Sequence, residues 1–174
     1  MILETSRLRI REISESDLDN LCEMLADEKV MEFSVNGPMS KPQTLDFINW
    51  CQSSYNDHGI GPWALVSKID GAFIGFAGLS KEFIDGVEEI HIGYRLARKY
   101  WNKGFATEAV SSIVDYGLSR NDQNRIYAII EPEHCSSIRV IEKAGFNISK
   151  QTKFHEKLTN IYVKSNLQDC SFSA

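Results

Sequence analysis

Two segments of this chain share one order of features: a strand-like run, a short polar turn and the start of a helix. In the first, the strand "VEEIHIGYRL" (87–96) precedes a helix with apolar periodicity over 104–120. In the second, the β-branched strand "RIYAIIE" (125–131) precedes a short helix over 134–146. Two adjacent strands that each end at a polar helix start form one cleft. The sequence therefore predicts a sheet with a cleft that a long ligand can cross.

The remaining segments add strands and helices around these two units. Asp70-Gly71 is a turn dipeptide typical of a hairpin between two apolar strands. In chain order, the expected elements are a strand at 7–13, helices at 16–27 and 42–57, a hairpin over 62–80, a strand at 87–96, a helix at 104–120, a strand at 125–131, a helix at 134–145 and two strands near 148–155 and 159–165. This order predicts a mixed α/β sheet in a single domain over 1–166, followed by a flexible tail at 167–174.

The composition is that of a globular domain and argues against several classes of protein. A net charge of −5 over 174 residues argues against nucleic acid as the main partner, because neutralising phosphates takes a basic face. No apolar run reaches the length of a membrane span, and residues 1–12 lack the apolar core of a signal peptide. The 4 cysteines form no C-x-x-C pair and indicate neither a metal site nor a disulfide framework. We expect a cytoplasmic protein.

The helix predicted at 104–120 begins with residues suited to an anion. Its first turn has free N–H groups at the positive end of the helix dipole, and Gly104 lets a ligand approach that backbone. Arg98, Lys103 and Thr107 add charge and a hydroxyl, which together predict a pyrophosphate site. Neither the Walker pattern nor G-x-G-x-x-G is present. The alternative is that Gly104 serves a tight strand-to-helix turn and binds nothing.

Two long motifs in this sequence are similar to those of a known family. "EEIHIGYRLARKYWNKGFATEAV" (88–110) followed by "EPEHCSSIRVIEKAGF" (131–146) resembles the GNAT superfamily of acetyl-CoA-dependent N-acetyltransferases. Within it, the sequence most resembles the branch of ribosomal-protein N-terminal (alanine or serine) acetyltransferases, over about residues 2–165. The resemblance implies one domain with a mixed, splayed and mostly antiparallel sheet of about seven strands and about four helices. Members of this branch are monomers or homodimers.

The resemblance also implies where acetyl-CoA binds. The backbone amides of 102–107 would hold the pyrophosphate, and the strand end from Tyr94 to Leu96 would pair with the pantetheine arm. Asn102 stands where the family often has Gly, and His134 stands where it usually has an Asn that contacts the coenzyme. The implied coenzyme-binding residues are Tyr94, Leu96, Arg98, Asn102, Lys103, Gly104, Phe105, Ala106, Thr107, His134 and Ser137.

Acetyl transfer to an amine needs a proton donor for the leaving thiolate and a proton acceptor for the amine. The family's pattern makes Ser137 the candidate acid, although a serine there also suits a helix N-cap. For the base, Glu89 shares one face of its strand with His91 by the two-residue period, and Glu156 lies near the start of the last hairpin. Glu89, His91 and Glu156 each have a plain alternative as a solvated surface side chain.

The acceptor would be a primary amine, either a protein N-terminus or a small molecule. The loop at 33–41 is the best candidate for its recognition, because loops carry variable function. Phe33, Met31, Trp50 and Trp63 are candidates for an acceptor pocket, but such residues also serve as core. Two other functions stay open from the sequence: a module that binds coenzyme A without turnover, and a domain that binds an unrelated phosphate ligand.

Overall fold

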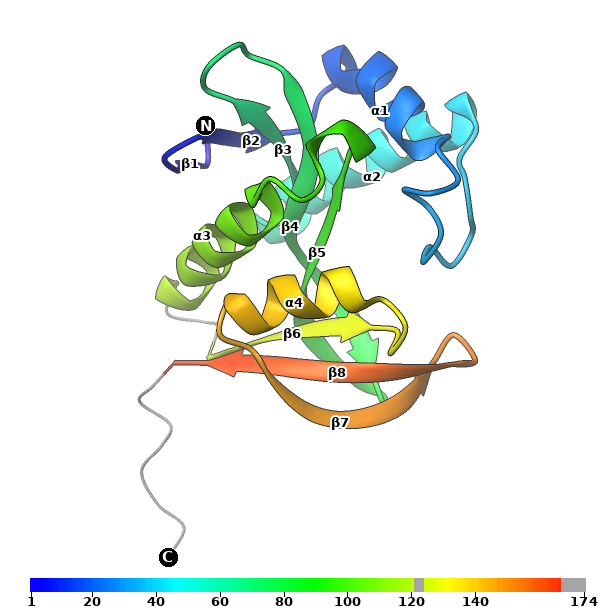
Figure 1. Cartoon of the computed structure of the whole chain (residues 1–174), viewed down its shortest axis with the longest axis vertical. Helices are drawn as coiled ribbons and strands as arrows, with labels where there is room; N and C mark the ends of the chain where they lie inside the picture. Colours follow the sequence, from blue (N-terminus) through cyan, green and yellow to red (C-terminus); the bar gives the residue numbers. More distant parts are fainter. Residues whose placement is uncertain (121–123, 167–174) are drawn as a thin grey trace, which may run out of the picture.

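The computed structural model describes residues 1–120 and 124–166, and its strands form one sheet in the order β1-β2-β3-β4-β5-β6-β8-β7 (Figure 1). The strands are β1 (Leu3–Glu4), β2 (Leu8–Glu12), β3 (Pro62–Ser67), β4 (Phe73–Ile84), β5 (Val87–Leu96), β6 (Arg125–Ile130), β7 (Asn147–Phe154) and β8 (Lys157–Ser165). The helices are α1 (Leu18–Leu25), α2 (Lys41–His58), α3 (Phe105–Ser119) and α4 (Cys135–Lys143), with short 3-10 turns at Glu15–Asp17 and Arg98–Tyr100. Within the described ranges, no helix is both long and apolar enough to span a membrane.

The expected mixed α/β sheet with four helices is confirmed, and the sheet has 8 strands where about seven were expected. The additional strand is β1, whose two residues are too few to show an alternating pattern. The β4 strand also runs further than expected, to Ile84, because Asp85 and Gly86 form a second tight turn with positive φ. The tail expected at 167–174 lies outside the described residues.

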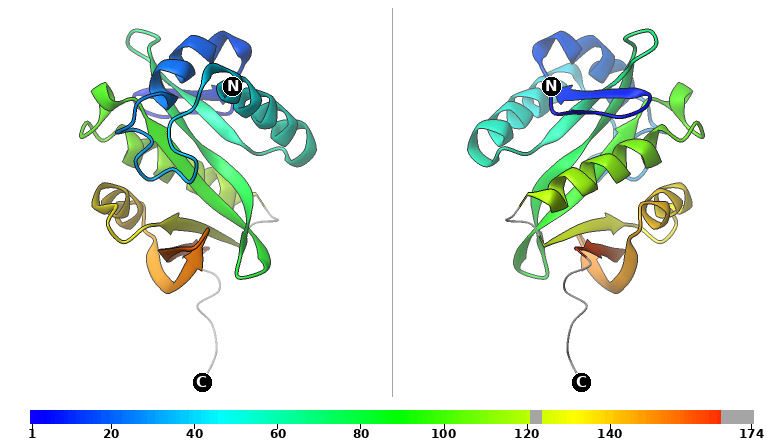
Figure 2. Two further views of the ribbon diagram at one scale, coloured as in Figure 1. Left: turned by 90° about the vertical axis from the view of Figure 1, so that its right-hand side faces the viewer. Right: turned by 90° about the vertical axis from the view of Figure 1, so that its left-hand side faces the viewer.

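The sheet is divided between β5 and β6, its one parallel pair. All other neighbouring strands are antiparallel, whereas β5 and β6 share a single register pair, His91 with Tyr127. Beyond this pair the two strands diverge toward their carboxyl ends. The result is two groups of strands, β1–β5 and β6–β8, joined at one edge (Figure 2). This is the splayed sheet that the resemblance implied.

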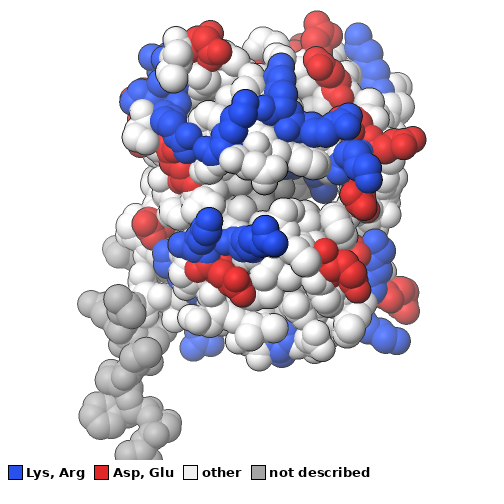
Figure 3. Space-filling view, in the orientation of Figure 1, with Lys and Arg blue, Asp and Glu red and all other residues white. Residues whose placement is uncertain are grey.

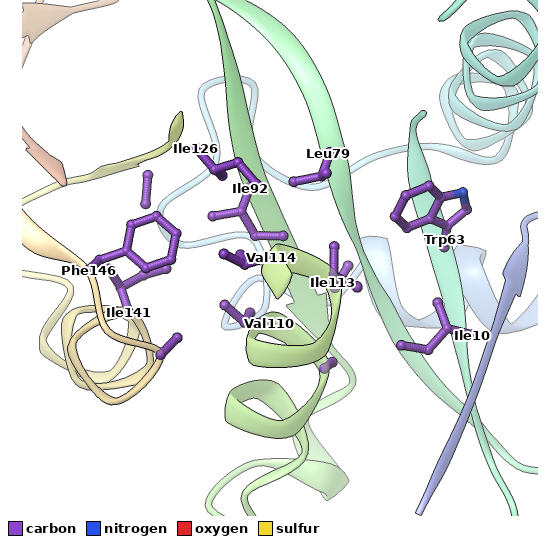
Figure 4. Packing of buried hydrophobic residues seen from close by; sticks show 14 of the residues in the cluster. Ile10, Trp63, Leu79, Ile92, Val110, Ile113, Val114, Ile126, Ile141 and Phe146 are labelled. Carbon is purple, nitrogen blue, oxygen red and sulfur yellow. The ribbon is translucent and has the colours of Figure 1, made fainter. Parts of the chain in front are cut away.

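Helices cover both faces of the sheet. On one face α3 and α4 pack against β4, β5 and β6, and on the other α1 and α2 pack against β3 and β4 (Figures 1 and 2). The first face buries Ile92, Ile113 and Phe146 in one continuous core (Figure 4). Strand β5 therefore presents Ile90, Ile92 and Leu96 to α3 and α4, and its alternate residues to the opposite face.

Two of the four residues proposed for an acceptor pocket are core residues. Trp63 and Met31 are each 1% exposed and pack inside the two hydrophobic clusters. Trp50 is on the outer side of α2 and is exposed. Of the four, Phe33 alone lines the cavity described below.

Candidate functional site

A cavity of about 680 Å³ opens where β5 and β6 diverge. Its wall is formed by residues 91–96 of β5, residues 128–130 of β6, the starts of α3 and α4, and the loop that follows α1. In the space-filling view, a groove crosses the molecule, with Lys and Arg side chains on both sides of it (Figure 3). The cations on the cavity wall are Lys29, Arg95, Arg139, Lys143 and Lys157, and the carboxylates are Glu32, Glu82 and Glu131.

The start of α3 forms one end of this cavity. Gly104 is the N-cap, with a φ of 79°, and Asn102 has a φ of 58°, so both lie in the left-handed region. Asparagine tolerates that conformation better than most non-glycine residues, so Asn102 keeps a backbone shape that glycine would adopt freely. The Trp101 indole N–H holds the loop by donating to the Leu96 carbonyl at 2.8 Å. The free amides of the first turn, at Phe105 and the two residues after it, belong to the cavity wall.

Glu108 fastens this helix start to the beginning of the chain. Its carboxylate accepts hydrogen bonds from the Thr5 hydroxyl at 2.6 Å, from the Ser6 hydroxyl at 3.0 Å and from the Arg7 backbone N–H at 2.8 Å. It also forms a 2.6 Å ion pair with Arg7, whose guanidinium donates to the Lys103 carbonyl. Burial raises the pKa of Glu108, but these hydrogen bonds outweigh it and lower the pKa to about 2. Glu108 was missed from the sequence because its partners lie about a hundred residues away.

The start of α4 brings two hydroxyl groups together in the cavity. The Ser137 and Tyr94 hydroxyl oxygens are 2.5 Å apart, and the Tyr94 hydroxyl also lies 3.0 Å from the Ser137 carbonyl. Ser137 is 8% exposed and sits inside α4, whose N-cap is His134, so it is not the capping residue. Burial is the main cause that raises the pKa of Tyr94 above its usual value, which keeps this phenol protonated at neutral pH.

The sequence matches the acetyltransferase (GNAT) domain family over residues 7–147. A curated relative, the N-acetyltransferase p20 of Bacillus licheniformis, is 31% identical over 95% of this chain and 96% of its own. The chain belongs to the GNAT acetyltransferase family. A GNAT-family acetyltransferase from Bacillus anthracis superposes with a TM-score of 0.80 at 25% identity, covering 94% of this chain and 97% of that one.

A ribosomal-protein acetyltransferase of known structure shares the fold of this GNAT acetyltransferase. RimL, a ribosomal L7/L12 α-N-protein acetyltransferase solved with coenzyme A, superposes with a TM-score of 0.80 at 16% identity. The superposition covers 94% of this chain and 97% of that one. At that identity the likeness is one of architecture.

The loop after α1 reaches across the cavity of this acetyltransferase to α4. The Phe33 ring stacks on the His134 imidazole, with centroids 4.0 Å apart and planes 9° from parallel. Burial is the first cause that lowers the pKa of His134, and the nearby charge of Arg95 lowers it further. A neutral imidazole at the N-cap of α4 therefore lies on the cavity wall at neutral pH, between the Phe33 ring and the charge of Arg95.

The face of β5 that turns away from α3 and α4 carries the polar residues of a second wall. His91 and Ser80 form a hydrogen bond of 2.9 Å between the imidazole Nε2 and the hydroxyl. Burial lowers the pKa of His91, and the charge of Glu82 opposes that shift. Glu82 and Glu89 are direct cross-strand partners, but Glu82 lines the cavity and Glu89 lies outside its wall.

The structure brings together most of the predicted site residues and leaves four outside the cavity wall. Arg98 is exposed and pairs with Asp27 at 2.7 Å, and Lys103 is exposed beside the Tyr100 ring. Glu89 lies beyond the wall, and Glu156 is exposed in the β7–β8 turn. The predicted residues that line the cavity are Tyr94, Leu96, Asn102, Gly104, Phe105, Ala106, Thr107, His134 and Ser137.

Proposed function

We propose that this GNAT acetyltransferase moves an acetyl group from acetyl-CoA to a primary amine by direct attack, with both substrates bound in the cavity between β5 and β6. The observation that carries this proposal is one continuous wall. It joins the anion-binding start of α3, the open edge of β5 and the Tyr94–Ser137 hydroxyl pair. These are the parts that a phosphate-bearing thioester and its departing sulfur require.

The coenzyme takes the side of the cavity next to α3 and α4. The pyrophosphate binds the free amides of the first turn of α3, which begins directly after the left-handed N-cap Gly104. The pantetheine arm follows β5 from Leu96 toward Tyr94, because β6 has diverged there and leaves that edge without a strand partner. Arg139 and Lys143, both on the wall and four residues apart on α4, add positive charge for the phosphates.

The chemical step needs no covalent intermediate on the protein. The amine nitrogen attacks the thioester carbon, the C–S bond breaks, and the thiolate takes a proton from the Tyr94–Ser137 pair. The proton lost by the amine passes to Glu82 or His91, either directly or through water. Glu82 takes this role in place of Glu89 because its side chain is the one on the cavity wall.

The test is release of coenzyme A thiol from acetyl-CoA, measured with and without a panel of primary amines. We expect release to depend on the amine and the acetylated amine to appear in equal amount. Binding of acetyl-CoA without release on any amine would contradict transfer and would favour a coenzyme-binding module. Failure of the folded protein to bind acetyl-CoA would overturn the proposal as a whole.

A further inference from the structure

Arg95 is a charged residue of the cavity wall that differs in its contacts from other arginines of the described chain. Arg7, Arg11 and Arg98 each form an ion pair with a carboxylate, at distances of 2.6 or 2.7 Å. Among residues 1–120 and 124–166, Arg95 has neither an ion-pair partner nor a side-chain hydrogen bond. The exposed Arg139 and Lys143 also lack ion pairs there, but water solvates them.

The surroundings of Arg95 make an unpaired charge costly. Its side chain is partly buried, and its cross-strand partner on β4 is Phe76, an almost fully buried ring that also lines the cavity. Burial lowers the pKa of Arg95, and no carboxylate offsets that effect. A cation held in such surroundings gains most from an anion that arrives with a ligand.

The face on which Arg95 lies indicates which ligand brings that anion. Arg95, Gly93 and His91 alternate with the residues that β5 turns toward α3 and α4, so they lie on the opposite face. The coenzyme-binding residues Tyr94 and Leu96 belong to the α3–α4 face. Arg95 therefore lies on the α1–α2 face of β5, where its charge also acts on His134, and not on the face of Tyr94 and Leu96. That face is the one left for the acceptor when the coenzyme follows the other.

The same face of β5 has a complementary group and free space. His91, with Glu82 beside it, lies four positions before Arg95, and Gly93 lies between them. A Cβ built on Gly93 would meet a single neighbour, His91 Cε1 at 3.8 Å, so the strand surface there is open. Arg95 and Gly93 are about 7 Å apart along the strand, which one arginine side chain spans. Along this face of β5, a proton acceptor at His91 and Glu82, an unobstructed strand surface at Gly93 and a cation at Arg95 follow one another.

We propose that Arg95 binds a carboxylate carried by the acceptor, and that the natural acceptor is an amine with a carboxylate close by, namely a free amino acid or a short peptide. This inference rests on the proposed function. The acceptor lies over Gly93 with its amine toward Glu82 and His91 and its carboxylate on Arg95. A polyamine has no group for Arg95 and meets a like charge there.

The experiment compares pairs of acceptors that differ in the carboxylate alone. The panel consists of free amino acids and di- and tripeptides, each with its carboxyl-terminal amide, together with L-lysine and its decarboxylated counterpart cadaverine. For each, kcat/KM is measured with wild type, Arg95→Gln, Arg95→Lys and the control Arg139→Gln. The affinity for acetyl-CoA is measured by calorimetry on the same four proteins.

The wild type is expected to prefer the carboxylate-bearing members by about tenfold to a hundredfold, the value of a charge-assisted bidentate contact. Arg95→Gln should remove that preference, and Arg95→Lys should restore part of it. Both should keep wild-type affinity for acetyl-CoA, whereas Arg139→Gln should weaken that affinity and leave the preference unchanged.

Two results would overturn this inference and leave the proposed function standing. One is a wild type that acetylates amides and cadaverine as well as the acids, or acetylates amines outside this panel and none within it. The other is an Arg95→Gln protein that loses acetyl-CoA affinity, which would assign Arg95 to a phosphate of the coenzyme. Absence of turnover on every amine tested would instead contradict the proposed function.

Discussion

The start of α3 and the face of β5 that carries His91, Gly93 and Arg95 line the same cavity, but they are built in different ways. The second is called the acceptor face below, after its proposed role. At the start of α3, side-chain contacts within the chain hold the helix in place and leave its first amides free: Glu108 receives its hydrogen bonds from Thr5, Ser6 and Arg7, and Trp101 holds the loop. On the acceptor face, Arg95 has no partner among the described residues. A region held in this way suits the proposed coenzyme site, whereas the second region leaves a charge available for the proposed acceptor.

The hydroxyl pair at the boundary of these two regions carries the largest expected effect on rate. We expect Tyr94→Phe and Ser137→Ala each to lower kcat modestly, because one hydroxyl remains to protonate the thiolate. The double variant should lose about a hundredfold to ten-thousandfold, the usual value of a general acid. Single-turnover rates of the wild type and the three variants measure this. A double variant as fast as either single one would show that water protonates the thiolate.

Glu108 gives the next largest effect, on stability. Because its pKa is lowered to about 2 in the folded protein, its contribution is present above its ordinary pKa near 4.5 and is lost as the pH falls toward 2. Replacement by glutamine should cost up to about 3 kcal/mol at pH 7 and much less at pH 2.5, measured by urea unfolding. Asp115→Asn on the same helix is the control, since Asp115 is 69% exposed in its pair with Lys164.

For that control we expect a loss of less than about 0.5 kcal/mol, as is usual for an exposed ion pair. Equal losses for Glu108→Gln and Asp115→Asn, or a Glu108→Gln loss that persists unchanged at pH 2.5, would contradict the anchoring role of Glu108. The comparison therefore measures how far the start of α3 depends on contacts with the beginning of the chain.

The smallest effect concerns the base, and two cross-strand partners provide the comparison. Glu82→Gln should lower kcat/KM about a hundredfold at pH 7, the lower end of the usual value of a general base, and Glu89→Gln should leave it near the wild-type value, because Glu82 alone of the two lines the cavity. The effect of Glu82→Gln should shrink above pH 8, where an α-amine loses its proton unaided. A pH–rate profile of each variant checks this. A larger loss of kcat/KM in Glu89→Gln than in Glu82→Gln would assign the role of general base to Glu89.

The sequence was most informative where local chemistry decides the structure. Apolar periodicity and alternation predict the elements at 104–120 and 87–96. The residues around Gly104 indicate that it stands at the start of α3. Asn102 adopts positive φ there, as a glycine would. The splay between β5 and β6 came from the resemblance to a family, because no residue pattern along either strand encodes where two strands separate.

Contacts between segments that are distant in the chain could not be predicted from the sequence. Which of Glu82 and Glu89 faces the cavity depends on the divergence of β6 from the sheet. The hydroxyl contact of Tyr94 with Ser137 joins residues 43 positions apart. That Arg95 has no ion pair within the described residues is visible only when the carboxylates of 1–120 and 124–166 have been placed. The proposed chemistry of the cavity rests on these three features, and each depends on tertiary packing.

The central claim is that the start of α3 binds the coenzyme and the acceptor face does not. Calorimetric titration of acetyl-CoA into wild type, Gly104→Asp and Glu82→Gln tests it most directly. We predict that Gly104→Asp abolishes binding, because a side chain is strained at positive φ, its Cβ would come within 3.3 Å of the Arg7 guanidinium that holds the Lys103 carbonyl, and its charge opposes an anion at the helix start. Glu82→Gln should bind as the wild type does. Undiminished binding by a folded Gly104→Asp protein, or an equal loss in Glu82→Gln, would contradict the account.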